Sequence, residues 1–150
     1  MRSGAPLSHI LSNGRYSVML TATGGGYSHW CGLAISRWRE DSSCDPWGSY
    51  ILLRDCASGV RWSPTLQPLD LHNSVPKDHK YSAFFSEDHA EFCLKQPGLT
   101  TKLDILISAE QDGEVLGQKG QAHEQAGQRV PARTPVLAGI RAQISPGRQG

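Results

Sequence analysis

Asn13-Gly-Arg-Tyr-Ser-Val-Met-Leu-Thr-Ala-Thr-Gly-Gly-Gly-Tyr-Ser-His-Trp30 is the stretch that decides the fold, because a turn signal, a strand and a glycine-rich loop follow one another in it. Every second residue from Tyr16 to Ala22 is apolar or aromatic, so these side chains would share one face of an extended strand. The loop carries two aromatic residues and leads into a second predicted strand at 33–38, with charged residues continuing to 41. The pattern predicts the edge of a β-sheet.

The same alternation recurs downstream, and helical periodicity is hard to find. Residues 49–54 and 60–62 read as two further strands. A hairpin follows, in which residues 81–85 and 90–94 alternate on either side of the turn Ser86-Glu-Asp-His89, and a last strand spans 99–108. Six or so short strands separated by turns predict an all-β fold, an antiparallel β-sandwich.

The chain changes character after Val115. Every Trp, Tyr and Phe lies at or before Phe92. Up to Val115 there are 10 basic and 13 acidic residues, and from Leu116 onward there are 5 basic residues and 1 acidic residue. The last segment is rich in Gly, Gln, Pro and Ala, and cannot bury enough apolar surface to offset its ordering entropy. We therefore predict a lead-in at 1–12, a partial sandwich domain at 13–115 and a low-complexity, disordered C-terminal tail at 116–150.

Charge and cysteine usage narrow the class of protein. A net charge of +1 gives no general electrostatic case for nucleic acid as a partner. No stretch approaches the roughly 18 apolar residues that span a bilayer, and the N-terminus lacks the apolar run of a signal peptide. Cys31, Cys44, Cys56 and Cys93 show no C-x-x-C spacing, which favours free thiols over a zinc site or a disulfide framework. These features predict a cytoplasmic chain without a direct membrane span.

The predicted hairpin turn gathers groups that could suggest catalysis. Glu87 and Asp88 are adjacent, and glycoside hydrolysis needs two carboxylates that bracket the bond from both sides, so turn chemistry explains them better. Ser86, Asp88 and His89 are likewise too close in sequence for the geometry of a catalytic triad. The six His residues are dispersed. We therefore predict no catalytic residue, no metal and no cofactor.

Several motifs together resemble one known family, and they occur in its order. They are Leu11-Ser-Asn-Gly-Arg-Tyr-Ser-Val-Met-Leu-Thr-Ala22, Gly24-Gly-Gly-Tyr-Ser28, Arg37-Trp-Arg-Glu-Asp41, Trp47-Gly-Ser-Tyr50, Leu53-Arg-Asp55, Trp62-Ser-Pro64 and Phe85-Ser-Glu-Asp88. They resemble the opening of the phosphorylase-type region of bacterial cyclic β-1,2-glucan synthases, in glycoside hydrolase family 94, formerly glycosyltransferase family 36. Cellobiose and chitobiose phosphorylases are more distant members. The resemblance covers roughly residues 10–115.

The resemblance implies an N-terminal β-supersandwich of the carbohydrate-binding type. In the family an (α/α)₆ barrel follows, which carries the general-acid Asp and transfers a glucosyl unit to or from phosphate. That barrel is absent from these 150 residues, and the sequence from Leu116 onward departs from the family pattern. We therefore expect a piece of a larger enzyme, with a truncation or a shifted reading frame near residue 115.

The resemblance also directs attention to the glycine-rich loop, which in the family lies toward the sugar. It implies that Tyr27 or Trp30 stacks on a sugar face and that Ser28 or a backbone N–H bonds a hydroxyl group. Arg37 would donate two parallel hydrogen bonds, and Trp47, in a polar turn, would be exposed. Structural alternatives stay open: the loop turns a sheet corner, the charges form solvated ion pairs, and the Trp residues pack in the core.

Three hypotheses for function follow. The chain is a non-catalytic carbohydrate-binding fragment whose partner is a β-glucan or another glucosyl saccharide. Alternatively, it is a subunit of a split glycosidic phosphorylase or glucosyltransferase that needs a separately encoded barrel, or a truncated fragment with no independent function. The resemblance also implies a parent enzyme associated with the inner membrane. Because part of the family's sandwich is missing, exposed apolar faces and open strand edges predict self-association.

Overall fold

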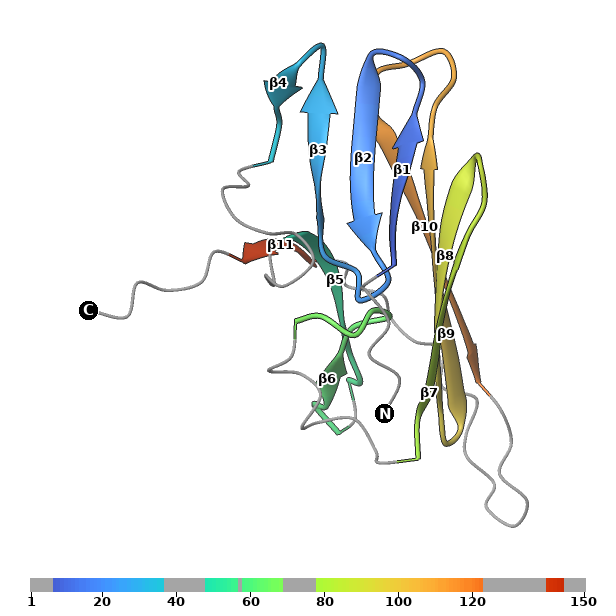
Figure 1. The fold of residues 1–150 in the computed structure, drawn as a ribbon. Helices are drawn as coiled ribbons and strands as arrows, with labels where there is room; N and C mark the ends of the chain where they lie inside the picture. The colour runs from blue at the N-terminus through green and yellow to red at the C-terminus, as the bar shows by residue number, and fades with distance from the viewer. Residues whose placement is uncertain (1–6, 37–47, 57, 69–77, 123–139, 145–150) are drawn as a thin grey trace.

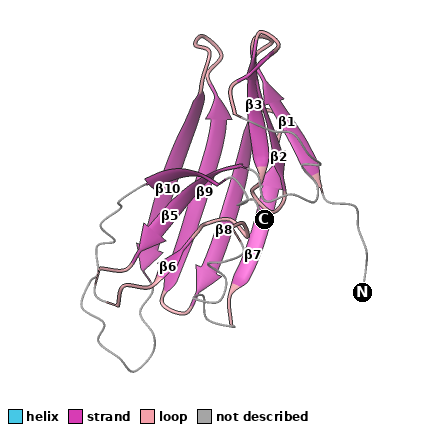
Figure 2. Ribbon diagram, turned by 90° about the vertical axis from the view of Figure 1, so that its left-hand side faces the viewer, coloured by secondary structure: helices cyan, strands magenta, loops and turns pink. Residues whose placement is uncertain are grey.

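The computed structural model describes residues 7–36, 48–56, 58–68, 78–122 and 140–144. Within these ranges the chain forms strands and loops but no helix, as Figure 2 shows, so no described helix is long and apolar enough to cross a membrane. The strands make three sheets, and every strand pair is antiparallel (Figure 1).

The first sheet contains the stretch that opens the sequence. Its strands lie side by side in chain order: β1 (Ser8–Ser12), β2 (Tyr16–Thr21), β3 (Gly26–Trp30) and β4 (Leu33–Ala34). The two residues between β3 and β4, Cys31 and Gly32, have φ angles of 47° and 82°. A type I′ turn requires positive φ at both positions, and its twist matches that of the flanking strands. The short hairpin therefore follows from this turn.

The second sheet has the order β10-β9-β8-β7, formed by β7 (Lys80–Phe85), β8 (His89–Gln96), β9 (Leu99–Ile107) and β10 (Glu114–Ala122). The hairpin predicted around the turn at 86–89 and the strand predicted at 99–108 are both confirmed. Pro97 and Gly98 join β8 to β9, and Gly98 has a φ of 79°. Proline followed by a residue of positive φ is the pattern of a type II turn.

The core lies between these two sheets, which face one another in Figure 1. Alternate residues of each sheet point inward and are buried: Leu11, Tyr16, Val18, Leu20, Ala90, Phe92, Leu103 and Ile105 form one cluster. The predicted antiparallel sandwich is thereby confirmed. Burying this apolar surface, at roughly 25 cal/mol per Å², is the main force that holds the sheets together.

The third sheet consists of β11 (Ile140–Ile144), β5 (Gly48–Arg54) and β6 (Arg61–Trp62). Leu53 and Trp62 pack with Leu94 of the second sheet to form a smaller cluster. Trp62 is buried, in line with the alternative in which the Trp residues pack in the core, whereas Trp38 lies outside the described residues. Tyr50 is also buried, and its desolvation raises the pKa of the phenol to about 12.

Several strand limits differ from the sequence-based expectation. β1 occupies 8–12, where we predicted a lead-in, and β10 continues to Ala122, inside the segment predicted to be a disordered tail. β11 also lies in that segment, while 123–139 and 145–150 lie outside the described residues. β10 forms despite its Gly and Gln residues because it pairs with β9 along its whole length, from Glu114 opposite Ile107 to Ala122 opposite Leu99. Main-chain pairing of this kind needs few apolar side chains.

Around the glycine-rich loop, the observed limits of two strands also differ from the predicted ones. β3 begins at Gly26, inside the segment that we predicted as a loop. The strand predicted at 33–38 is shorter, because only Leu33 and Ala34 pair with β3, and residues 37–41 lie outside the described part of the chain. Of the cysteines, Cys31 and Cys56 are exposed free thiols, Cys93 is a buried one, and Cys44 is outside the described residues.

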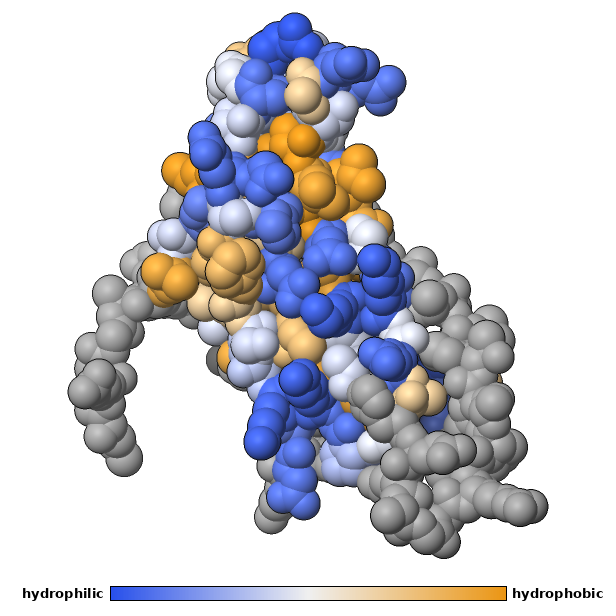
Figure 3. Space-filling view, turned by 90° about the vertical axis from the view of Figure 1, so that its right-hand side faces the viewer, coloured by the Kyte–Doolittle hydropathy of each residue, from blue (hydrophilic) through white to orange (hydrophobic). Residues whose placement is uncertain are grey.

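An exposed apolar patch lies on the outer face of the second sheet. Phe84, Leu106 and Val115 are all exposed, and the register sets Leu106 between His89 and Val115. The rings of Phe84 and His89 lie 6.1 Å apart. Figure 3, which faces this side, shows apolar groups gathered among hydrophilic ones. Such a patch and the edge strand β10 are both features through which chains associate.

We therefore expect the purified chain to self-associate. Size-exclusion chromatography with light scattering should show dimers or larger species whose share grows with concentration. Val115→Lys puts a charge in the patch and should shift the distribution toward monomer. Association would bury this charge without a partner between the two chains, which costs free energy. A monodisperse wild-type monomer at all concentrations would contradict this expectation.

Candidate functional site

The predicted binding residues are split by the alternation of one strand. Arg37 and Trp47 lie outside the described residues. Tyr27, Ser28 and Trp30 all belong to β3, in which successive side chains point to opposite faces of the sheet. Because β3 is a strand and not a loop, these three side chains do not form one surface.

Ser28 and Trp30 are on the face of β3 that looks toward the second sheet, since Ser28 lies opposite the core residue Val18. Tyr27 lies opposite Met19 on the other face, and its ring contacts that of His29 with 4.9 Å between centroids. Tyr27 is therefore partly covered, and it does not share a binding surface with Trp30.

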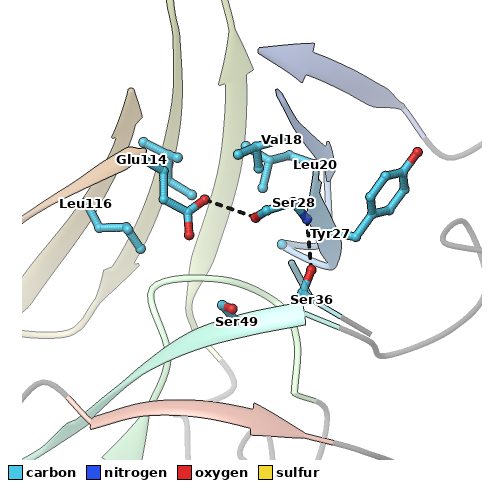
Figure 4. Close-up of a pocket in the computed structure, with 11 residues that line it drawn as sticks. Val18, Leu20, Tyr27, Ser28, Ser36, Ser49, Glu114 and Leu116 are labelled. Carbon is cyan, nitrogen blue, oxygen red and sulfur yellow. Dashed lines mark hydrogen bonds between the residues drawn. The ribbon is translucent and has the colours of Figure 1, made fainter. Parts of the chain in front are cut away.

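Ser28 lines a small pocket where β3, β5 and β10 meet (Figure 4). Its residue surface is only 6% exposed, its hydroxyl donates to Glu114 Oε2 over 3.5 Å, and its main-chain N–H donates to Ser36 Oγ over 2.8 Å. The cavity volume is about 20 Å³, which holds roughly one water molecule. A sugar ring does not fit, so the pocket accepts at most a water or a single hydroxyl group.

The glycine-rich turn between β2 and β3 is covered by a neighbouring loop. Gly24 and Gly25 are buried, and the N–H of Gln67 donates to the carbonyl of Thr23 over 2.9 Å. Gly24 has a φ of 94°, and a Cβ there would overlap the side chain of Thr65. This placement supports the alternative in which the glycines turn a sheet corner.

Trp30 joins a group of residues that lie far apart in the sequence. Its indole N–H donates to Asp112 Oδ2 over 2.8 Å, and Arg15 Nε donates to Asp112 Oδ1 over 2.8 Å. Leu33 lies directly opposite Trp30 across the two-residue turn. We call Arg15, Trp30, Leu33 and Asp112 the tip cluster, because they lie at the end of the sandwich where hairpin turns of both main sheets meet (Figure 1).

Asn13 holds the turn that carries Arg15. Its Oδ1 accepts the N–H groups of Arg15 and Tyr16 over 3.0 and 2.7 Å, which is the Asx-turn use of asparagine. Its Nδ2 donates across to the β9–β10 loop, to the carbonyls of Ser108 over 2.9 Å and Gln111 over 3.2 Å. The two main sheets are thus tied at this end by side chains almost a hundred residues apart, and no local spacing in the sequence indicates such a contact.

The tip cluster perturbs the pKa of its carboxyl group. The pKa of Asp112 is lowered from 3.8, mainly because Trp30 and then Arg15 donate hydrogen bonds to the charged form. A folded-state pKa below the unfolded one means that this carboxylate contributes stability fully above pH 3.8. The contribution is lost as the pH falls through the folded pKa.

We therefore predict that Asp112, followed by carboxyl ¹³C NMR, titrates below 3.8 in the folded chain. Trp30→Phe removes the donor with the largest effect and should move the midpoint upward. Phe84→Leu, on the outer face of the second sheet, should leave it unchanged. A wild-type midpoint at or above 3.8 would show that these contacts do not persist in solution.

The hairpin turn at 86–89 does not have the geometry of a triad. Ser86 Oγ lies 2.6 Å from His89 Nδ1, and Asp88 Oδ1 lies 2.9 Å from the same nitrogen. A Ser-His-Asp relay needs the serine and the carboxylate on different ring nitrogens. The hydrogen bonds from His89 and Ser86 lower the pKa of Asp88 to about 2. The prediction that turn chemistry explains these residues agrees with this arrangement.

Comparison with known proteins places the fold in a family. The family model described as glycosyl hydrolase 94, supersandwich domain, matches residues 2–117. The cyclic beta-(1,2)-glucan synthase NdvB of Rhizobium meliloti (strain 1021) is 41% identical over 105 residues, which are 70% of this chain but only 4% of that protein. The match connects the chain to an enzyme of glucan metabolism, of which it spans a small part. The family model covers most of the chain, and the described residues form an antiparallel sandwich. The chain therefore belongs to the glycosyl hydrolase 94 supersandwich domain family.

Proposed function

We propose that this chain is a non-catalytic carbohydrate-binding module related to cyclic β-1,2-glucan synthases, and that it binds a β-glucan in the cytoplasm. The observation that carries the proposal is the 41% identity to a protein named as a cyclic beta-(1,2)-glucan synthase, together with the family match over residues 2–117. Linear and cyclic β-1,2-glucans are therefore the first ligands to test.

The surroundings of three described carboxylates, those of Glu91, Asp112 and Glu114, support a binding role over a hydrolytic one. Glycoside hydrolysis needs two carboxyl groups roughly 5–9.5 Å apart on either side of a sugar-sized cleft. The carboxylate of Glu91 is ion-paired with Lys102 at 3.1 Å, and that of Asp112 with Arg15 at 2.8 Å. Glu114 lines the pocket that holds about one water. These three carboxylates are thus engaged with Lys102, Arg15 and Ser28, and are not arranged as the acid and base of a hydrolytic pair.

Isothermal titration calorimetry of the full chain tests the proposal. We expect saturable binding of linear or cyclic β-1,2-glucan, and weaker or no binding of an α-1,4-linked maltooligosaccharide as the comparison. The absence of binding to every β-glucan would contradict the proposal. Incubation with glucan and inorganic phosphate should release no glucose 1-phosphate. Its formation by the chain alone would replace the binding role with a catalytic one.

A further inference from the structure

We propose that the tip cluster is the saccharide-binding site of this chain, and that it takes a neutral glucosyl unit of a glucan. Trp30 and Leu33 supply the apolar platform, while Arg15 and Asp112 bond hydroxyl groups at its rim. This inference rests on the proposed function and deepens it, because it names the surface and the class of ligand.

The platform follows from the register of the hairpin. Trp30 and Leu33 are directly opposite one another across the Cys31-Gly32 turn, so their side chains lie on the same face of the sheet. Trp30 is 40% exposed and Leu33 is 62% exposed, although both look toward the side where the core lies. The face of an indole ring carries negative partial charge and attracts the C–H groups that line one side of a pyranose ring.

The polar rim is held in place before any ligand arrives. The carboxylate of Asp112 accepts hydrogen bonds from the indole N–H of Trp30 and from Nε of Arg15, each over 2.8 Å, and so orients both side chains. The guanidinium of Arg15 carries four further N–H donors on its two Nη atoms, and a carboxylate has about four lone-pair positions for hydroxyl donors. Groups ordered in this way lose little conformational entropy on binding, so more of the contact energy appears as affinity.

The charge of the cluster selects the class of ligand. Arg15 and Asp112 carry opposite charges and are ion-paired, so the rim has no net charge. An anion such as phosphate would gain from Arg15 but be repelled by Asp112 at close range. A neutral polyol can use both groups at once, because its hydroxyls both accept from the guanidinium and donate to the carboxylate.

NMR of the full ¹⁵N-labelled chain locates the ligand. The indole signal of Trp30 is identified by its loss in Trp30→Phe, and linear β-1,2-glucan is then titrated into the wild-type chain. We expect this signal to move along a saturation curve, while the signal of the buried Trp62 stays in place. Inorganic phosphate at the same concentration should not move it, and a phosphate-induced shift matching that of the glucan would overturn the neutral-ligand assignment.

Substitutions with matched controls complete the test. Trp30→Ala should weaken glucan binding about tenfold or more, which is the usual effect of removing an aromatic ring that stacks on a ligand ring, as in proteins that stack on nucleic-acid bases. Arg15→Gln should weaken it several-fold. Phe84→Ala and Arg61→Gln change an exposed aromatic and an exposed arginine away from the tip, and should leave the affinity unchanged. If Trp30→Ala unfolds, the wild-type NMR titration and Arg15→Gln decide the outcome.

The results separate this inference from the proposed function. Glucan binding seen by calorimetry with an unmoved Trp30 signal, or with unchanged affinity in Arg15→Gln, would overturn the tip site and leave the carbohydrate-binding role intact. No glucan binding by the wild-type chain would overturn both. Binding that moves the Trp30 signal and is lost in the tip variants alone would support both.

Discussion

Phe92→Ala is expected to lower the free energy of unfolding by about 3–5 kcal/mol, the usual cost of removing a buried phenylalanine ring. Phe92 is fully buried in the centre of β8, between Ala83 of β7 and Leu103 of β9. Its ring also meets that of Phe85 edge to face, with 5.9 Å between centroids. The substitution therefore removes both buried area and an aromatic contact, and leaves a cavity between the sheets.

Urea unfolding followed by circular dichroism measures this loss. The free energy of unfolding of an ordinary domain is only about 5–15 kcal/mol. The variant should therefore be largely unfolded, or should unfold at a much lower urea concentration. Phe84→Ala is the matched control, because Phe84 lies on the neighbouring strand but is 60% exposed, and it should change stability by well under about 1 kcal/mol. Equal effects in the two variants would show that the core does not lie between these two sheets.

Gly26→Ala is expected to destabilise the first sheet by about 3 kcal/mol, near the upper end of the range for overpacking. Gly26 begins β3 opposite Leu20, and a Cβ at this position would overlap the main-chain carbonyl oxygen of Met19. A main-chain atom cannot rotate away as a side chain can. The β2–β3 pairing must therefore shift, and with it the strand that carries Trp30.

Gly113→Ala is the control for Gly26→Ala. A Cβ at Gly113 meets no atom within 4 Å, and the residue has no positive φ, so alanine is tolerated there. We expect the midpoint temperature of thermal unfolding of Gly113→Ala to equal that of the wild type or to be slightly higher, since alanine restricts the unfolded chain. A Gly26→Ala variant with wild-type stability would mean that β2 and β3 are not packed as closely as the structure has them.

The strands that could be predicted from the sequence are those with strong alternation and clear turn signals. The hairpin around 86–89 combines alternating apolar residues with a polar turn, so its type and approximate limits follow from local physics. β3 and β10 were missed because glycine and glutamine give a strand no local signal. Both exist because a neighbouring strand offers unpaired main-chain groups.

The candidate site was predictable only in part. Trp30 stood out as an aromatic residue beside a glycine-rich segment, but its partners Arg15 and Asp112 did not. Arg15 and Asp112 are separated by 97 positions in the sequence. A contact between residues so far apart along the chain depends on how the two sheets pack. The family resemblance points to Tyr27, Ser28 and Trp30 together, as residues of one loop that lies toward the sugar. In the strand that the structure shows, Tyr27 points to one face of the sheet, while Ser28 and Trp30 point to the other.

The sequence by itself determined the class of fold and the family, because alternation, turn residues and motif order are local properties of the chain. Only the tertiary structure decided which residues meet at the tip, that the glycine turn is covered, and that the segment after 115 continues as a paired strand. The physical reason is that packing of two sheets and pairing at a strand edge are set by partners far along the chain. Short-range patterns carry no information about such partners.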